Sequence, residues 1–285
     1  MKVSEHEDKF RVSEIFYSIQ GEGLYVGTPS VFLRLFGCNF TCGGFSMPRG
    51  ELSDERFKVD PDEYEKYEDL PLVHTGCDSY ASWDPRFKHL SPWMSYEEIG
   101  DKIEKLIDYN FFSVNRHLIL TGGEPMLWQA KLPRLITYLQ DRLQLSHLTI
   151  ETNGTQELTE EFRNSFECLQ EVVFSVSAKL PCSGEKWSDA IKPHSVGSYW
   201  APHTRWIVYF KFVVDSDKDL IHVKSAMAEY KRNLYADAIV YLMPAGGTTK
   251  YYDENKEKIC RLCMEKGFRY SPRLQIDLFG NQWGT

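Results

Sequence analysis

The 285-residue chain has no apolar run that approaches the roughly 20 residues needed by a membrane-spanning helix. It also lacks an excess of positive charge, because 41 acidic and 33 basic side chains give a net charge of −8. Such a charge disfavours binding to nucleic acid or to an anionic membrane. The polar residues 1–14 lack the apolar core of a secretory signal. We therefore expect a cytoplasmic protein whose partner is a small molecule or another protein.

Cysteine is scarce, and its number is odd, with seven in the chain. In a reducing compartment such cysteines are more often free, catalytic or metal-bound than paired in disulfides. Cys38 and Cys42 are separated by three residues in "FGCNFTCGGF" (36–45), and the next cysteine is Cys77. Three thiolates brought together in one loop would suit zinc or an iron–sulfur cluster.

The spacing of these residues leaves the metal open. His74 precedes Cys77 by three positions, so Cys38, Cys42, His74 and Cys77 could form a closed zinc site. In the alternative, three cysteines bind a four-iron cluster and leave one iron free for another ligand. A third interpretation is that the cysteines are buried and unrelated to one another.

Residues 43–76, between the second and third of these cysteines, form an acidic segment. They contain nine Asp and Glu residues against four Lys and Arg residues, and show the pattern of neither a strand nor a core helix. We expect a solvated surface insertion. The alternative is a surface that docks a partner, such as an electron donor.

Outside this insertion, apolar strand patterns alternate with amphipathic helix patterns. The predicted strands are 30–37, 116–123, 147–152, 171–178, 206–214 and 238–246. The predicted helices are 95–110, 132–145, 218–233 and 255–268. Nearly continuous apolar strands are typical of parallel sheets that are covered on both faces. We therefore predict one α/β domain over residues 1–285, with a mainly parallel sheet that is open or part of a barrel.

Several predicted strands end in glycine or polar residues. "LILTGGEPML" (118–127) continues a strand into Gly122, Gly123 and Glu124, where backbone could approach a ligand and the acid could pair with an amine. The alternative is a tight turn with an exposed acid. Two other strand ends carry polar residues, namely Glu151, Thr152 and Asn153, and Ser175, Ser177 and Lys179. Because the carboxyl ends of parallel strands share one edge of a sheet, we expect these groups around one mouth.

The three-cysteine loop, the GGEP turn and the polar strand ends follow one another along the chain. In these features and their order the chain resembles the radical S-adenosylmethionine (SAM) superfamily. The segments 14–38, 77–83 and 271–285 are similar to the 7-carboxy-7-deazaguanine synthase family. The resemblance covers most of the chain outside 43–76. It implies a partial (β/α)6-type barrel, and in this chain the acidic insertion would lie in its cluster loop. It also implies a homodimer and an electron donor such as flavodoxin or ferredoxin.

The resemblance implies three cofactors. Cys38, Cys42 and Cys77 would hold a [4Fe–4S] cluster, whose open iron would bind SAM. Glu124 would face the ammonium of SAM, and Ser79 would offer its hydroxyl to Mg2+, which prefers oxygen donors. The SAM-binding residues implied are Gly122, Gly123 and Glu124 at the methionine end, Ser177, Ala178 and Lys179 along the ribose, and Met243, Pro244, Ala245 and Gly246 around the adenine.

The substrate implied is 6-carboxy-5,6,7,8-tetrahydropterin. A 5′-deoxyadenosyl radical would take hydrogen from its C6, and ring contraction with loss of ammonia would give 7-carboxy-7-deazaguanine, in 7-deazapurine biosynthesis of the queuosine type. Arg34 would pair with the substrate carboxylate, because a guanidinium can donate two parallel hydrogen bonds. The substrate-binding residues implied are Ile19, Gln20, Gly21, Glu22, Arg34, Thr121, Gln275 and Thr285.

Two features depart from the family pattern. One is the insertion 43–76, and the other is Gln275, where the family often has a histidine that can take up a proton. Two alternative functions remain at this point. One is another radical SAM enzyme, such as a glycyl-radical activase, and the other is a zinc-stabilised binding protein without enzymatic activity. The QGEG sequence at 20–23, Arg34 and the segment 271–285 favour the synthase.

Overall fold

A computed structural model of the chain describes residues 8–200, 206–234 and 237–285. The predicted domain 1–285 also includes residues 1–7, 201–205 and 235–236, which lie outside the described residues.

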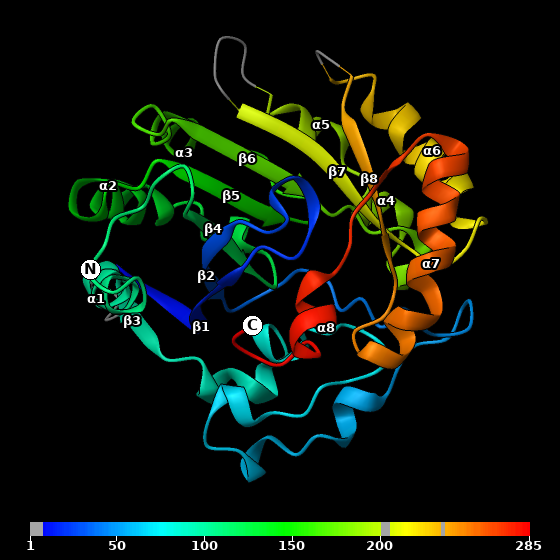
Figure 1. Cartoon of the computed structure of the whole chain (residues 1–285), viewed down its shortest axis with the longest axis horizontal. Helices are drawn as coiled ribbons and strands as arrows, with labels where there is room; N and C mark the ends of the chain where they lie inside the picture. Colours follow the sequence, from blue (N-terminus) through cyan, green and yellow to red (C-terminus); the bar gives the residue numbers. More distant parts are fainter. Residues whose placement is uncertain (1–7, 201–205, 235–236) are drawn as a thin grey trace.

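In the described part of the chain, nine strands form one sheet in the order β3-β1-β2-β4-β5-β6-β7-β8-β9. From β2 to β9 neighbouring strands are parallel, whereas β1 and β3 form an antiparallel edge. The sheet curves around the chain's C-terminal segment without closing (Figure 1). This confirms the predicted partial barrel. The strands are β1 Lys9–Ile19, β2 Pro29–Leu35, β3 Trp93–Ser95, β4 His117–Gly122, β5 His147–Thr152, β6 Glu171–Val176, β7 Trp206–Val214, β8 Ile239–Pro244 and β9 Arg269–Tyr270.

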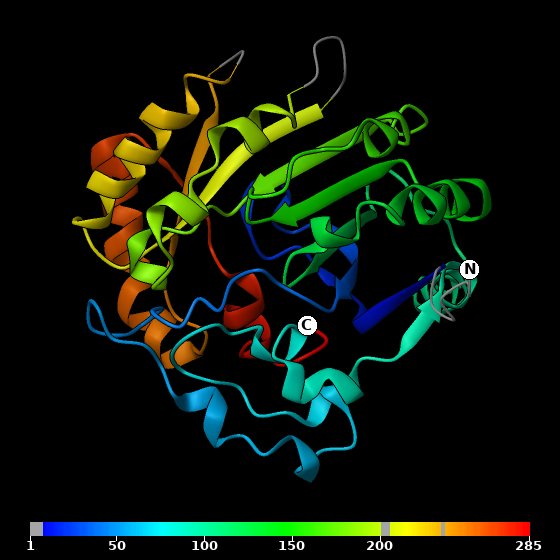
Figure 2. The same ribbon diagram turned by 180° about the vertical axis from the view of Figure 1, so that it is seen from behind.

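Most of the described helices cover the outer, convex face of the sheet, as the two views in Figures 1 and 2 show. All four helices predicted from the sequence are present, as α1, α2, α6 and α7. None of the described helices is long and apolar enough to cross a membrane. The helices are α1 Tyr96–Leu106, α2 Leu132–Leu143, α3 Glu160–Asn164, α4 Trp187–Ala190, α5 Pro193–Gly197, α6 Asp219–Tyr230, α7 Thr249–Lys266 and α8 Leu274–Phe279.

Local chemistry sets the helix ends, and apolar spacing sets the buried faces. At the start of α1, the Ser95 hydroxyl accepts from the N–H of Glu98, while the Glu98 carboxylate accepts from the N–H of Ser95. This reciprocal pair satisfies two N–H groups that a helix N-terminus leaves free. The helix α2 buries five apolar residues at helical spacing, namely Leu132, Leu135, Ile136, Leu139 and Leu143.

The parallel strands bring their carboxyl ends to one edge of the sheet. Leu35 at the end of β2 pairs with Gly122 at the end of β4. A side chain at Gly122 would place its Cβ 2.0 Å from the Leu35 carbonyl oxygen, and its φ of +136° also disfavours other residues. The N–H of Glu124 then donates to the carbonyl of Gly37 (2.8 Å). The GGEP turn is therefore held against the loop that carries Cys38.

The acidic insertion 43–76 forms only short 3-10 turns, at Glu55–Lys58, Pro61–Glu63 and Tyr67–Asp69. This agrees with the prediction of neither strand nor core helix. The expectation of a merely solvated insertion is corrected, because Val59, Tyr67, Leu70 and Val73 are buried together with Tyr80, Ala81 and Phe87 in a second apolar cluster. The insertion lies beside the C-terminal segment in both ribbon views (Figures 1 and 2).

The core between the sheet and its outer helices predicts a measurable loss on truncation. Leu120 in β4 is fully buried, so Leu120→Ala leaves a cavity and should lower the free energy of unfolding by about 2–5 kcal/mol. Urea unfolding followed by circular dichroism measures this change. Leu278→Ala is the matched control, because that side chain is 53% exposed. Equal effects of the two substitutions would contradict the assignment of this core.

Candidate active site

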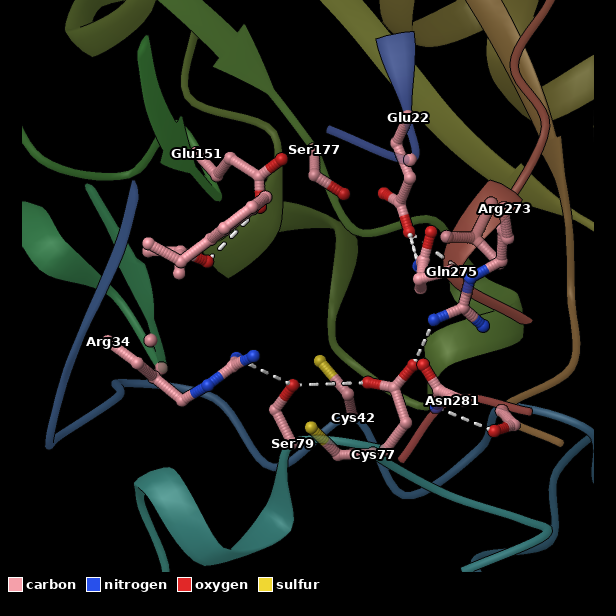
Figure 3. A pocket seen from close by; sticks show the side chains of 18 of the residues that line it. Glu22, Arg34, Cys42, Cys77, Ser79, Glu151, Ser177, Arg273, Gln275 and Asn281 are labelled. Atoms are coloured by element: carbon pink, nitrogen blue, oxygen red, sulfur yellow. Dashed lines mark hydrogen bonds and ion pairs between the residues drawn. The ribbon is translucent and has the colours of Figure 1, made fainter. Parts of the chain in front are cut away.

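A cavity of about 230 Å³ lies at the carboxyl ends of the parallel strands. Figure 3 shows that side chains from far apart in the sequence point into it. Most of the residues that the sequence singled out line this cavity, which brings the predicted cluster and substrate residues together. They are Ile19, Gln20, Gly21, Glu22, Arg34, Cys38, Cys42, Cys77, Ser79, Thr121, Gly122, Gly123, Ser177, Lys179, Met243, Gly246, Gln275 and Thr285.

The three cysteines lie at one end of the cavity and none of them is in a disulfide. Burial raises the pKa of the Cys38 thiol to about 12, and it also raises the pKa of Cys42 and Cys77. The backbone N–H of Phe40 donates to Cys38 Sγ (3.4 Å), and the Trp83 indole N–H donates to Cys77 Sγ (3.3 Å). Three unpaired sulfurs, two of which accept from N–H donors, fit an iron–sulfur cluster, whose sulfur ligands commonly accept such bonds.

Hydrogen bonds between the two ends of the insertion explain how Cys77 reaches the other cysteines. The N–H of Gly76 donates to the carbonyl of Phe45 at 2.8 Å, and the Ser53 hydroxyl donates to the carbonyl of Thr75 at 3.2 Å. The N–H of Ser53 in turn donates to the carbonyl of Gly43 at 2.8 Å. The intervening residues therefore loop out from a closed base. The entropy of closing a loop grows only slowly with its length, so 34 extra residues do not prevent three cysteines from sharing one site.

A single carboxylate holds the loop at Cys42. Glu185 Oε1 accepts from the backbone N–H of Thr41 (2.8 Å), from that of Cys42 (2.7 Å) and from the Thr41 hydroxyl (3.2 Å). Cys42 has a φ of +48°, which is unfavourable for a residue with a side chain. The three bonds from one oxygen compensate for that cost and fix where the Cys42 sulfur points.

The predicted alternative of a Cys3His zinc site does not match the position of His74. His74 Nδ1 lies 3.1 Å from the Thr248 hydroxyl, and His74 is not among the residues that line the cavity. Among the described residues, no group of three or more His, Cys, Asp and Glu side chains is arranged to hold one metal ion. In a four-iron cluster each cysteine binds a different iron, so the sulfurs need not converge on a single point.

Charged residues fill the other end of the cavity. Glu22 Oε2 accepts from the ammonium of Lys211, and its Oε1 accepts from Arg273 Nε (3.2 Å) and Gln275 Nε2 (2.8 Å). Although burial favours the protonated acid, the two cations lower the pKa of Glu22 to about 2. Glu22 is therefore an ionised acceptor. Gln275 Oε1 is buried and finds no hydrogen-bond donor within the described part of the chain.

A second carboxylate, Glu151, lies across the cavity from Glu22 (Figure 3). Its oxygens accept from the Thr121 hydroxyl (3.1 Å) and from Gln20 Nε2 (3.4 Å), and Lys211 Nζ lies 3.5 Å away. The ammonium of Lys211 is thus shared between two carboxylates. Burying an ammonium without such partners would be costly.

Arg34 forms a cross-strand pair with Glu14, which lies opposite it in the antiparallel ladder of β1 and β2. Arg34 Nε donates to Glu14 Oε2 at 2.7 Å, and Arg34 Nη1 donates to the Ser79 hydroxyl at 3.4 Å. Although burial opposes it, the charge of Glu14 raises the pKa of Arg34 above its usual value. Figure 3 shows the guanidinium at the edge of the cavity, next to the cysteines.

Comparison with known proteins identifies the family. The chain is 30% identical over 277 residues to the 7-carboxy-7-deazaguanine synthase of Pyrobaculum aerophilum. The matched region covers 97% of each of the two chains. The chain belongs to the 7-carboxy-7-deazaguanine synthase family. It is also 29% identical over 290 residues to the synthase of Halobacterium salinarum, over 95% of this chain and 90% of the relative.

The structural comparison agrees on the fold. The crystal structure of QueE from Escherichia coli matches with a TM-score of 0.53 over 95% of this chain and 98% of that chain, at 21% sequence identity. A search of family models finds no match.

Four residues predicted to bind SAM do not line the cavity, namely Glu124, Ala178, Pro244 and Ala245. The contact between Glu124 and the SAM ammonium stays a prediction, and the structure adds that its fully buried carboxylate is held by the protein. Its oxygens accept from the Thr152 hydroxyl (2.8 Å), the N–H of Asn153 (2.6 Å) and the N–H of Met126 (3.0 Å). The acid therefore ties the GGEP turn to the end of β5. Gly122 and Gly123 line the cavity instead.

Sequence reasoning missed several residues at the charged end of this synthase-family site, chiefly Lys211 and Arg273. Lys211 did carry a signal, since it is the one charged residue in the apolar run "WIVYFKFVV" (206–214). Arg273 lies in the segment 271–285 that was singled out for its family resemblance, but nothing in that segment indicated a contact with the cavity. Its partners, Glu22 and Asp78, are distant in the sequence.

The contacts of Glu185 predict that it is needed to assemble the thiol end of the site. Glu185→Gln keeps the shape but replaces a charged acceptor with a weaker one, so less iron should bind per chain after reconstitution, by about twofold or more. Iron and sulfide analysis measures this directly. Glu161→Gln, on the exposed side of α3, is the control. Unchanged iron content in Glu185→Gln would contradict the proposed anchoring.

Proposed function

We propose that this chain is a radical SAM enzyme that converts 6-carboxy-5,6,7,8-tetrahydropterin into 7-carboxy-7-deazaguanine with loss of ammonia. Membership of the synthase family supports this activity. The main observation behind this proposal is that three free cysteines and the Glu22, Glu151 and Arg34 side chains line the same cavity. A zinc-stabilised binding protein would have no use for such a charged cavity beside its metal.

The cysteine end of the cavity would hold a [4Fe–4S] cluster and SAM. When bound, they supply the radical that takes hydrogen from the substrate, while the protein orients the reactants and excludes water. Gly122 and Gly123 offer backbone groups without side chains beside Cys38, as shown by the 2.7 Å that would separate a Gly123 Cβ from Cys38 Cβ. Ser177 and Lys179 also line the cavity, and Lys179 Nζ donates to the Ser177 hydroxyl (3.1 Å).

The charged end of the cavity suits a carboxylated pterin. A pterin presents N–H donors along its pyrimidine edge, and the ionised carboxylate of Glu22 is a strong acceptor for them. Glu151 would accept at a second position. Arg34 uses Nε for Glu14 and leaves guanidinium N–H groups free to bind the substrate carboxylate.

Gln275 and Ser79 would contribute oxygen atoms to the site, the first for the substrate and the second for Mg2+. Gln275 donates to Glu22 and leaves its carbonyl oxygen, which has no donor within the described residues, to accept from the substrate. An amide holds its protonation state, so Gln275 would bind rather than transfer a proton. The Ser79 hydroxyl lies 3.3 Å from Asp78 Oδ1, and this oxygen-rich corner fits the preference of Mg2+.

Two partners follow from the proposed chemistry and the family. The cluster needs one electron from a donor such as flavodoxin or ferredoxin, and the family implies a homodimer. A cytoplasmic location would supply the reducing conditions that free cysteines require.

Anaerobic turnover tests the proposed function. The protein is reconstituted with iron and sulfide and given Mg2+, SAM, a reductant and 6-carboxytetrahydropterin. Mass spectrometry should then detect 7-carboxy-7-deazaguanine, and Cys77→Ala should abolish it because the cluster would lose one of its three ligands. Cys168→Ala, which replaces an exposed cysteine outside the cavity, serves as the control.

Two other results of this experiment would contradict the proposal. SAM cleavage without a deazapurine would indicate a radical SAM enzyme that acts on another substrate. A colourless protein that retains zinc would indicate a structural role for the cysteines.

A further inference from the structure

The acidic insertion contacts the segment 281–285, which lines the cavity. The Trp283 indole N–H donates to the carbonyl of Leu70 at 2.8 Å. The rings of Tyr67 and Trp283 meet edge to face, with centroids 4.9 Å apart. Tyr80, just beyond the insertion, also faces Trp283 at 6.1 Å. The insertion thus seats Trp283, which means that it packs the Tyr67 ring against the indole and accepts a hydrogen bond from the indole N–H.

The segment seated in this way reaches the Arg34–Glu14 pair. Although burial of Glu14 is the largest effect and raises the pKa of its carboxyl group, Arg34 and a hydrogen bond from the backbone of Gly284 lower it. Gly284, next to Trp283, therefore contributes to holding the carboxylate that orients Arg34. Trp283, Gly284 and Thr285 all line the cavity.

Tyr67 occupies an unusual position for a residue in a surface insertion. It is 4% exposed, and its hydroxyl is buried with no hydrogen-bond partner within the described part of the chain. Burial is the main effect on the pKa of Tyr67 and raises it, the charge of Arg34 lowers it, and the charge of Glu14 raises it. Tyr67 therefore lies on the same side of the site as the Arg34–Glu14 pair, and it packs on Trp283, the neighbour of Gly284.

We propose that the insertion 43–76 is a positioning element of the substrate site, in which Tyr67 seats Trp283 and thereby fixes the Glu14–Arg34 pair that binds the substrate carboxylate. This inference rests on the proposed function. It assigns to the insertion a task at the substrate end of the cavity, separate from the spacing of the cysteines. Tyr67 and Trp283 are positioning residues that act through Glu14 and Arg34.

The ring of Tyr67, rather than its hydroxyl, performs this task, because the ring packs on Trp283 while the hydroxyl makes no hydrogen bond within the described part of the chain. Tyr67→Ala should therefore raise the KM for 6-carboxytetrahydropterin about tenfold or more, with a smaller change in kcat. Trp283→Ala should do the same. Tyr67→Phe keeps the ring and should restore a KM within about twofold of the unmodified protein.

The control for these variants is Phe57→Ala. Phe57 is an aromatic residue of the same insertion, but it is 59% exposed and contacts neither Trp283 nor the cavity. Its KM should stay unchanged. Iron content and the dissociation constant for SAM should stay unchanged in all four variants, because the thiol end of the cavity is held by Glu185 and by the base of the insertion.

A second measurement does not depend on turnover. Hydrogen–deuterium exchange of the peptide that contains residues 281–285 should be faster in Tyr67→Ala than in Tyr67→Phe or Phe57→Ala. If the unmodified protein makes no deazapurine, the proposed function fails, and exchange alone decides whether the insertion seats this segment. If product forms but Tyr67→Ala alters neither the KM nor the exchange, the inference is overturned while the function stands. A parallel loss of iron in Tyr67→Ala would also overturn it, since the insertion would then act on the cluster loop.

Discussion

The site depends on the pairing of one buried ammonium, that of Lys211, with two carboxylates. Lys211 lies in the middle of β7 and is 3% exposed, where an unpaired charge would be very unfavourable. Glu22 comes from the loop after β1, and Glu151 comes from the end of β5. The loop and the two strands must therefore meet at one point. This requirement holds the QGEG sequence over the mouth of the partial barrel.

The same pairing separates the cavity into two chemical environments. Around Lys211 and Arg273, charges of both signs are close together and compensate one another, so polar ligand groups can replace water without leaving charges unpaired. Around Cys38, Cys42 and Cys77, the surroundings are apolar enough to raise the pKa of the thiols. A soft metal cluster suits the second environment, and a carboxylated heterocycle suits the first.

The sequence predicted the parts of the fold that have a regular pattern. The strands β2 and β4 to β8 are buried on both faces and read as apolar runs, so each was found to within a few residues. The strand β1 was missed, because it mixes charged and apolar residues, and its register shifts between Val12 and Glu14. That irregularity interrupts the alternation by which a strand is recognised.

The candidate site could be predicted where a motif is local, and not where a contact is distant. The cysteines and the QGEG loop were identified from short stretches, and they line the same cavity. The donors that hold the Glu124 carboxylate were not foreseen, because they come from Thr152 at the end of β5 and Asn153 just after it. The packing of Tyr67 on Trp283 joins residues more than 200 positions apart, and no periodic pattern in either segment indicates it.

The most direct test of the central claim is electron paramagnetic resonance of the reconstituted, chemically reduced protein before and after addition of SAM. Three cysteine ligands leave one iron open, so we expect the signal of a reduced [4Fe–4S] cluster, and we expect SAM to change its shape by binding that iron. A cluster signal that SAM leaves unchanged, or no cluster signal at all, would contradict the account.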